Sequence, residues 1–236
     1  MILILSGEGG TDLGGESEFG MRPGPMAHLV DQLIEDLINY SPVQCQSVKW
    51  YSRSQLGARA KATSVPRITL PGFKRAQGYV GHFKQAQALG ILARETEQRE
   101  GAPSLAVMFR DSDGTNSSPA SHWENLVNAI DSGFKAADYL YGVAMVPKPK
   151  QESWLLCALK DDPYVGCQPL EDESGNDDAP RALKAMLRDV VGFEPSVDEM
   201  CEWITTRRFD SSRVQMASFE RFKESLTQAI RALQAR

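Results

Sequence analysis

The sequence is poor in the features that mark zinc sites, disulfide frameworks and membrane spans. Its 236 residues include four cysteines and three histidines, and no two cysteines have Cys-x-x-Cys spacing. No apolar run approaches the roughly 20 residues that span a bilayer. The first apolar run, residues 2–5, is too short for a signal peptide. We therefore expect reduced cysteines, with two disulfides as the alternative, and a cytoplasmic protein without membrane association.

Acidic residues are absent from residues 37–94, although the chain carries 31 acidic and 26 basic residues. Nine basic residues lie in this stretch, interleaved with aromatic ones. A local basic surface suits a polyanion, and aromatic side chains among cations suit unpaired bases. The alternative is a solvated basic face that pairs with acidic neighbours. The residues expected to bind nucleic acid or another phosphate ligand are Arg53, Arg59, Lys61, Arg67, Lys74, Arg75 and Lys84.

Apolar runs and helical periodicity alternate along the first 160 residues. Strands are predicted at residues 2–5, 43–50, 105–109 and 139–146. Helices are predicted at residues 26–38, 79–99, 119–133 and 152–159. Residues 51–78 have the composition of a loop, with a short strand near Ile68. Helices alone follow, near residues 183–190, 197–204 and 218–233.

This order of elements predicts an α/β fold with a mostly parallel central sheet flanked by helices. Residues 1–160 would form the core, with a basic insertion at about 49–84. Residues 161–236 would form a helical C-terminal extension packed on the core as one structural unit. Within that extension, residues 161–178 hold seven acids and no base, and their Gly, Asp and Ser content indicates an exposed loop.

Acidic residues follow three of the four predicted strands. Glu8 follows the first strand, and Asp12 comes one turn later. Asp111 and Asp113 follow the third strand, and Glu152 follows the fourth. Ligands of open parallel sheets bind beyond the carboxyl ends of the strands, and residues i and i+2 of a strand point to one side. Oxygen donors without nearby His or Cys favour Mg²⁺ or Mn²⁺ over zinc.

Each of these segments also has a simpler interpretation. Asp-Ser-Asp-Gly at residues 111–114 is a common turn, and Glu152 can be a first-turn acid that interacts with a helix dipole. The Gly-rich residues 7–10 can form a phosphate loop, but they lack the Gly-Lys-Ser/Thr of a Walker A motif. The joint pattern, acids at three strand ends, is stronger than any single member.

Three segments together resemble the Toprim domain of topoisomerases, primases and overcoming-lysogenization-defect nucleases. They are Gly-Glu-Gly-Gly-Thr-Asp, Arg-Asp-Ser-Asp-Gly and Gln-Glu-Ser-Trp-Leu-Leu, each placed after an apolar run. The chain is closer to small stand-alone Toprim-like proteins of unassigned function. These tend to carry Ser-Phe-x-x-Phe near the C-terminus, as residues 218–222 do here.

The resemblance implies a Mg²⁺- or Mn²⁺-dependent nuclease, a phosphodiesterase acting on DNA or RNA. Glu8, Asp111, Asp113 and Glu152 match catalytic acids and metal ligands, and Asp12 matches a position where relatives often have Glu. Lys184 matches a lysine of related nucleases. The resemblance further implies a role in bacterial phage defence or repair, and an ATPase or other protein as partner. The sequence leaves the oligomeric state open, and a homodimer is one option.

Two other functions fit the sequence. A Toprim-like module can bind nucleic acid or a partner protein without catalysis. Alternatively, residues 109–115 resemble the first motif of haloacid-dehalogenase-type phosphatases, with Asp111 as the nucleophile. That arrangement needs Lys148 or Lys150 as the lysine and an acidic pair, residues 161–162, at the end of a strand.

Overall fold

A four-stranded parallel sheet forms the centre of the computed structural model, which describes residues 1–7, 12–17, 20–62, 79–115 and 118–235. Its strands, in the spatial order β4-β1-β5-β6, are β4 (Val48–Trp50), β1 (Ile2–Ser6), β5 (Ser104–Phe109) and β6 (Gly142–Met145). Leu3 of β1 lies opposite both Val48 and Leu105. The predicted α/β class, with a parallel sheet between helices, is therefore confirmed.

The sheet is apolar on both faces because successive strand residues point to opposite sides. Leu3 and Leu5 of β1 enter one hydrophobic core, whereas Ile2 and Ile4 enter the other. Strands β5 and β6 alternate in the same way. This double burial explains why the strands are continuous apolar runs in the sequence.

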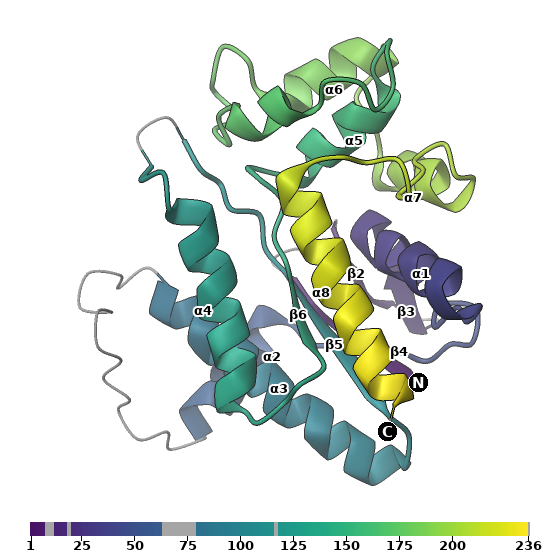
Figure 1. Ribbon diagram of the computed structural model, residues 1–236, viewed down its shortest axis with the longest axis vertical. Helices are drawn as coiled ribbons and strands as arrows, with labels where there is room; N and C mark the ends of the chain where they lie inside the picture. The colour runs from purple at the N-terminus through teal and green to yellow at the C-terminus, as the bar shows by residue number, and fades with distance from the viewer. Residues whose placement is uncertain (8–11, 18–19, 63–78, 116–117, 236) are drawn as a thin grey trace.

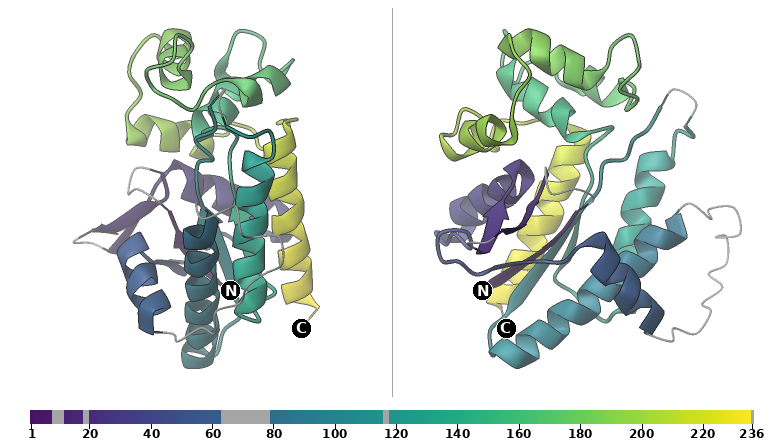
Figure 2. Two further views of the ribbon diagram at one scale, coloured as in Figure 1. Left: turned by 90° about the vertical axis from the view of Figure 1, so that its left-hand side faces the viewer. Right: turned by 180° about the vertical axis from the view of Figure 1, so that it is seen from behind.

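Helices cover both faces of the sheet (Figures 1 and 2). Side chains of α1 (Pro25–Ile38), α7 (Val197–Thr205) and α8 (Ala217–Gln234) enter the core of Leu3 and Leu5. Side chains of α2 (Arg53–Ala62), α3 (Val80–Glu100) and α4 (His122–Ala136) enter the opposite core. In the described part of the chain, none of the helices combines the length and apolar character needed to cross a membrane.

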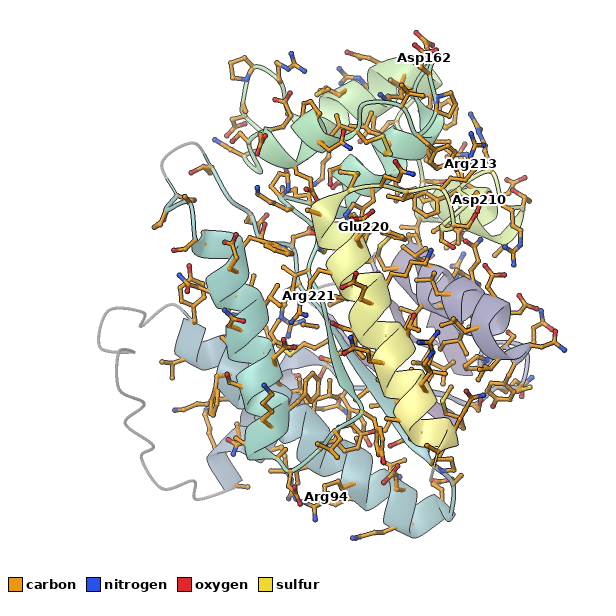
Figure 3. All side chains as sticks on the ribbon, in the orientation of Figure 1. Arg94, Asp162, Asp210, Arg213, Glu220 and Arg221 are labelled. Atoms are coloured by element: carbon orange, nitrogen blue, oxygen red, sulfur yellow. A yellow bond between two sulfur atoms is a disulfide. The ribbon has the colours of Figure 1, made fainter. Side chains whose placement is uncertain are left out.

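The helices α5 (Gln151–Leu159) and α6 (Leu183–Val191) lie with α7 beyond the carboxyl ends of the strands, at the top of Figure 1. A short 3₁₀ helix, η3 (Gln168–Asp172), lies between α5 and α6 in the chain. Helix α7 begins with the capping box of Ser196 and Glu199 that its sequence indicates. Helix α8 returns along the sheet, and its Arg221 pairs with Asp131 of α4 at 3.0 Å (Figure 3).

Helix α8 also packs against α5 through aromatic side chains. The ring of Phe219 meets that of Trp154 edge-on at 5.0 Å, and Phe222 stacks on Trp154 at 6.0 Å. All three side chains are buried. The Ser-Phe-x-x-Phe segment and the Trp-Leu-Leu segment are thus two halves of one packed cluster. Residues of both predicted chain regions, 1–160 and 161–236, contribute to this core.

Two local predictions need correction, and one hairpin was not predicted. Residues 53–62 form helix α2 rather than a loop; Leu56 is its one buried residue, so the sequence lacks helical apolar periodicity there. The Gly-rich segment before α1 forms a hairpin of β2 (Gly14–Ser17) and β3 (Gly20–Pro23). Strand β4 starts later than predicted, because residues 42–46 form turns. The strand predicted near Ile68 lies outside the described residues.

The cysteines also differ from the prediction that all four are reduced. Cys157 at the end of α5 and Cys167 just before η3 form a disulfide, and both are buried. Cys45 and Cys201 are free. The prediction failed because it rested on the compartment in which such a sequence is expected, and not on the distance between the two residues.

Candidate functional site

The chain segments after β5 and β6 continue side by side past the end of the sheet. The amide of Ser112 donates to the carbonyl of Pro147 at 3.3 Å, and the amide of Asp113 donates to that of Pro149 at 3.0 Å. These bonds hold the Asp-Ser-Asp-Gly turn next to the start of α5. Residues that follow separate strands are therefore placed at one edge, as expected for parallel strands.

Gln151, the first residue of α5, connects two of the predicted acids. Its backbone amide donates to Oδ1 of Asp111 at 3.1 Å. Its side-chain Nε2 donates to Oδ1 of Asp12 at 2.7 Å, across 139 residues of sequence. Asp12 follows β1 and Asp111 follows β5, so one residue orients carboxylates from two strand ends.

Glu152, the next residue, is 7% exposed. Its Oε2 is buried, and in the part of the chain that the structure describes it has no hydrogen-bond partner. The same holds for Oε1 of Gln151. Buried polar atoms without a partner are costly, so each of these oxygens can accept a cation or a hydrogen-bond donor supplied from outside the described residues.

Burial, and then repulsion between the carboxylates, raises the pKa of the two innermost acids. Burial, followed by the charges of Glu152, Asp12 and Asp113, raises the pKa of Asp111 well above its usual range, although the amide of Gln151 acts in the opposite direction. Burial also raises the pKa of Glu152, against the effects of Lys184 and Lys150. A cluster of this kind is less repulsive when a divalent cation binds to it.

Asp113 differs from Asp111 in its surroundings. Its side chain is 59% exposed, and its Oδ1 lies 3.7 Å from Nζ of Lys150. The strand has ended at Phe109, and Asp113 has a positive φ of 49°. The geometry of an extended strand, in which residues i and i+2 point to one side, therefore does not apply to this Asp-x-Asp pair.

Two lysines border the carboxylates. Nζ of Lys150 lies 2.8 Å from Oδ1 of Asp177, and Nζ of Lys184 lies 3.1 Å from Oδ2 of the same residue. The structure thus brings Lys184, at the start of α6, to the rim of the cluster. Side-chain hydrogen bonding to Asp177, and then the charge of Glu152, raise its pKa.

The predicted site residues are placed as follows. Asp12, Asp111 and Glu152 meet around Gln151, whereas Asp113 and Lys184 lie at the rim. Glu8 lies outside the described residues. Sequence reasoning assigned neither Gln151 nor Asp177 to this edge, and it named Lys150 only for the phosphatase alternative. The unbroken Lys-Gln-Glu run at residues 150–152 was the available signal for two of them, whereas Asp177 gave none.

The basic stretch is described in part. Arg53, Lys61 and Lys84 are exposed on α2 and α3. Arg59 instead pairs with Glu95, and Lys49 pairs with Glu100. The remaining residues expected to bind nucleic acid lie outside the described residues: Arg67, Lys74 and Arg75. Acids of α3 therefore neutralise part of the stretch, as the solvated-face alternative supposed.

A cavity of about 290 Å³ lies on the other side of the Asp-Ser-Asp-Gly turn. Thr115, His122, Lys148 and Glu171 are among its lining residues, but Asp12, Asp111 and Glu152 are not. Nε2 of His122 contacts the carbonyl of Ser112 at 2.7 Å, which ties the cavity wall to the turn. The cavity therefore borders the turn but does not contain the carboxylate cluster.

The phosphatase arrangement is not formed. Residues 161–162 follow helix α5 rather than a strand, and Figure 3 shows Asp162 at the outer tip of the upper helices. The described residues fit the metal-site hypothesis only in part. Among the described residues, no three His, Cys, Asp or Glu side chains already form a set that holds an ion. A bound cation would nevertheless give the buried oxygens of Gln151 and Glu152 a partner. It would also favour the ionised form of Asp111, whose pKa is raised without it.

Comparison of this chain with protein-family models, with curated proteins and with solved structures finds no match. The interpretation of the site therefore rests on its own residues.

Proposed function

We propose that this protein is a Mg²⁺- or Mn²⁺-dependent phosphodiesterase of the Toprim type that acts on DNA or RNA. The observation that carries the proposal is the meeting of Asp12, Asp111 and Glu152, from three distant segments, around Gln151 at the carboxyl edge of the sheet. The Toprim resemblance and the orphaned oxygens of Gln151 and Glu152 support it.

The donor set suits a hard divalent cation. Asp12, Asp111 and Glu152 would hold it, with Glu8 and Asp113 as the further acids that the sequence predicts. When bound, such an ion lowers the pKa of a coordinated water and stabilises negative charge on a phosphate oxygen. Cation binding requires ionised carboxylates, so the affinity for the cation should fall at low pH. Because the pKa of Asp111 is raised, this fall should begin at a higher pH than for an ordinary aspartate.

The chain's own residues orient this edge. Gln151 fixes Asp111 through its backbone amide and Asp12 through its side chain. Lys150 and Lys184 place positive charge beside the carboxylates, where a phosphate group of a nucleic acid would lie. The exposed Arg53, Lys61 and Lys84 would contact further backbone phosphates, so binding should weaken as salt concentration rises.

Several broader parts of the proposal rest on the resemblance or on composition. They are the ATPase or other protein partner, the role in phage defence or repair, and the cytoplasmic location. The buried disulfide of Cys157 and Cys167 is unusual for a reducing compartment, so thiol counting, described below, bears directly on the location.

The test is cleavage of supercoiled plasmid and of single-stranded DNA and RNA, with Mg²⁺ or Mn²⁺ and with EDTA. Asp111→Ala should abolish metal-dependent cleavage. Asp178→Asn is the matched control, since Asp178 is exposed on a loop and lies outside the cluster. Cleavage that survives Asp111→Ala would reject these ligands. Tight DNA binding that is indifferent to Mg²⁺ and to Asp111→Ala would instead favour a non-catalytic binding module.

A further inference from the structure

The acidic segment of residues 161–178 reaches back to basic residues beside the carboxylate cluster. Lys148 and Lys150 follow β6, and each meets an acid of this segment. Nζ of Lys148 lies 3.4 Å from Asp172, and Nζ of Lys150 lies 2.8 Å from Asp177. The segment thus covers cations that a phosphodiesterase would use to attract its substrate.

Asp177 binds two lysines at once through different oxygens. Oδ1 faces Lys150, and Oδ2 faces Lys184 at 3.1 Å. The two oxygens of the carboxylate are bonded to one carbon, and each contacts a separate ammonium group. The two non-bridging oxygens of a phosphodiester are bonded to one phosphorus and can make the same pair of contacts. The negative charge is shared over two oxygens in both groups, so the carboxylate of Asp177 resembles the phosphate that these lysines would bind.

This phosphate-like contact borders the carboxylate cluster. Lys150 lies 3.7 Å from Oδ1 of Asp113 while it holds Asp177, and the side chain of Lys150 is only 13% exposed. The charges of both lysines act on Glu152. A phosphate in the place of Asp177 would therefore lie beside the acids that would hold the metal.

The disulfide of Cys167 and the bond from the amide of Ser218 to the buried Glu171 anchor the first part of the segment. The part that carries Asp177 is attached in a way that allows displacement. Asp177 and Lys184 each have side chains that are 51% exposed, and ion pairs this exposed change an equilibrium constant only a few-fold. The backbone adds the bond from the amide of Gly175 to the carbonyl of Gly114 at 2.7 Å. A polyanion with several phosphates can compete with these contacts.

We propose that Asp177 occupies the position of a substrate phosphate between Lys150 and Lys184, so that the acidic segment is an autoinhibitory competitor that nucleic acid must displace. This inference rests on the proposed function, because it takes nucleic acid as the ligand. It adds the residues that contact the phosphate and a regulatory role for residues 161–178.

The experiment measures binding without catalysis. A short fluorescein-labelled single-stranded oligonucleotide is titrated with protein in EDTA, and the anisotropy gives the Kd. Asp177→Asn removes the carboxylate charge between the lysines and should lower the Kd by about threefold to tenfold. Asp178→Asn makes the same change of net charge one residue later and should change the Kd by less than about twofold. Adding Lys150→Gln to Asp177→Asn should remove the gain.

Three results would overturn the inference: an unchanged Kd for Asp177→Asn, an equal effect of Asp177→Asn and Asp178→Asn, or no oligonucleotide binding by any variant. The second result would show that only net charge matters. The proposed hydrolysis fails separately. If Asp177→Asn tightens binding as expected but Mn²⁺ produces no cleavage, the competitor role stands and the phosphodiesterase does not.

Discussion

The indole N–H of Trp154 donates a hydrogen bond of 2.8 Å to Oγ of Ser218, although 64 residues separate the two in the chain. Both residues are buried. Trp154 lies in α5, two residues after Glu152, and Ser218 lies in the first turn of α8. The backbone amide of Ser218 also donates to Glu171 at 2.7 Å. The C-terminal helix therefore holds in place the helix that carries the candidate site.

Ser218→Ala should lower the free energy of unfolding by about 1–3 kcal/mol, because the buried indole N–H of Trp154 would lose its acceptor. The backbone bond to Glu171 is retained in this variant. Ser225→Ala, a half-buried serine on the same helix, should stay within about 0.5 kcal/mol of wild type. Urea unfolding followed by tryptophan fluorescence measures both. Equal stabilities of the two variants would mean that the Trp154–Ser218 bond contributes nothing.

The disulfide predicts a thiol count. Under denaturing, non-reducing conditions an alkylating reagent should modify Cys45 and Cys201 and leave Cys157 and Cys167 unmodified. Mass spectrometry should show two alkyl groups, and four after reduction. Because the bond closes a loop of about ten residues, its reduction should cost about 2–3 kcal/mol of stability. Four modified cysteines without reductant would show that the chain is purified in the reduced form.

The surroundings of His82 indicate that the folded protein loses stability in acid. Burial, and then the positive charges of Arg110, Arg53 and His122, lower the pKa of His82 from 6.5 to about 4. The unfolded chain therefore binds a proton that the folded protein does not, so stability falls as pH drops from 6.5 through 4. The full contribution is below about 3 kcal/mol, because solvent screens the charges around this partly buried ring.

His82→Gln should remove this component. The difference in unfolding free energy between wild type and variant is measured at pH 7 and at pH 4.5. The variant should gain relative to wild type by about 1–2 kcal/mol at the lower pH, because pH 4.5 is still above the folded-state pKa of His82 and solvent screens this partly buried group. Parallel pH profiles for the two proteins would show that His82 titrates normally in the folded state.

Lys61 and Lys84 should contribute to the salt dependence of oligonucleotide binding. Both are exposed in the basic stretch. Reversing both to Glu should weaken oligonucleotide binding and lower the slope of log Kd against log salt by about 1.4, since each phosphate contact contributes about 0.7 on single strands. The control reverses Lys135 and Arg231, which are exposed outside the stretch. Equal slopes for the two double variants would mean that the basic stretch is a solvated face.

Much of the fold and of the acidic edge could be predicted from the sequence. Strands buried on both faces are apolar runs, and parallel strands bring their carboxyl ends together, so Asp12, Asp111 and Glu152 were expected at one edge. The Ser-x-x-Glu spacing of residues 196–199 is likewise a local pattern, and it indicates the capping box that begins α7. These features depend on short stretches of chain and on a general rule of sheet geometry.

Other features depend on contacts that no local pattern reports. Helix α2 buries only Leu56, so its sequence has no apolar stripe. Asp177 lies in a loop and meets Lys150 only after the chain has folded back. The disulfide likewise depends on the approach of α5 and η3. Asp113 was expected to face the same ion as Asp111, but its positive φ points to a different backbone geometry.

The proposed function depends on the binding of a divalent cation by Asp12, Asp111 and Glu152. Isothermal titration of Mn²⁺ tests it on wild type, Asp111→Asn, Glu152→Gln and the control Asp178→Asn. Asp111→Asn keeps an oxygen that can accept from the amide of Gln151, so the fold should be preserved. We predict that wild type and Asp178→Asn bind Mn²⁺ alike and that each site variant binds at least about 10- to 100-fold more weakly. Equal Mn²⁺ binding by all four proteins, or binding by none, would show that these carboxylates do not form a metal site.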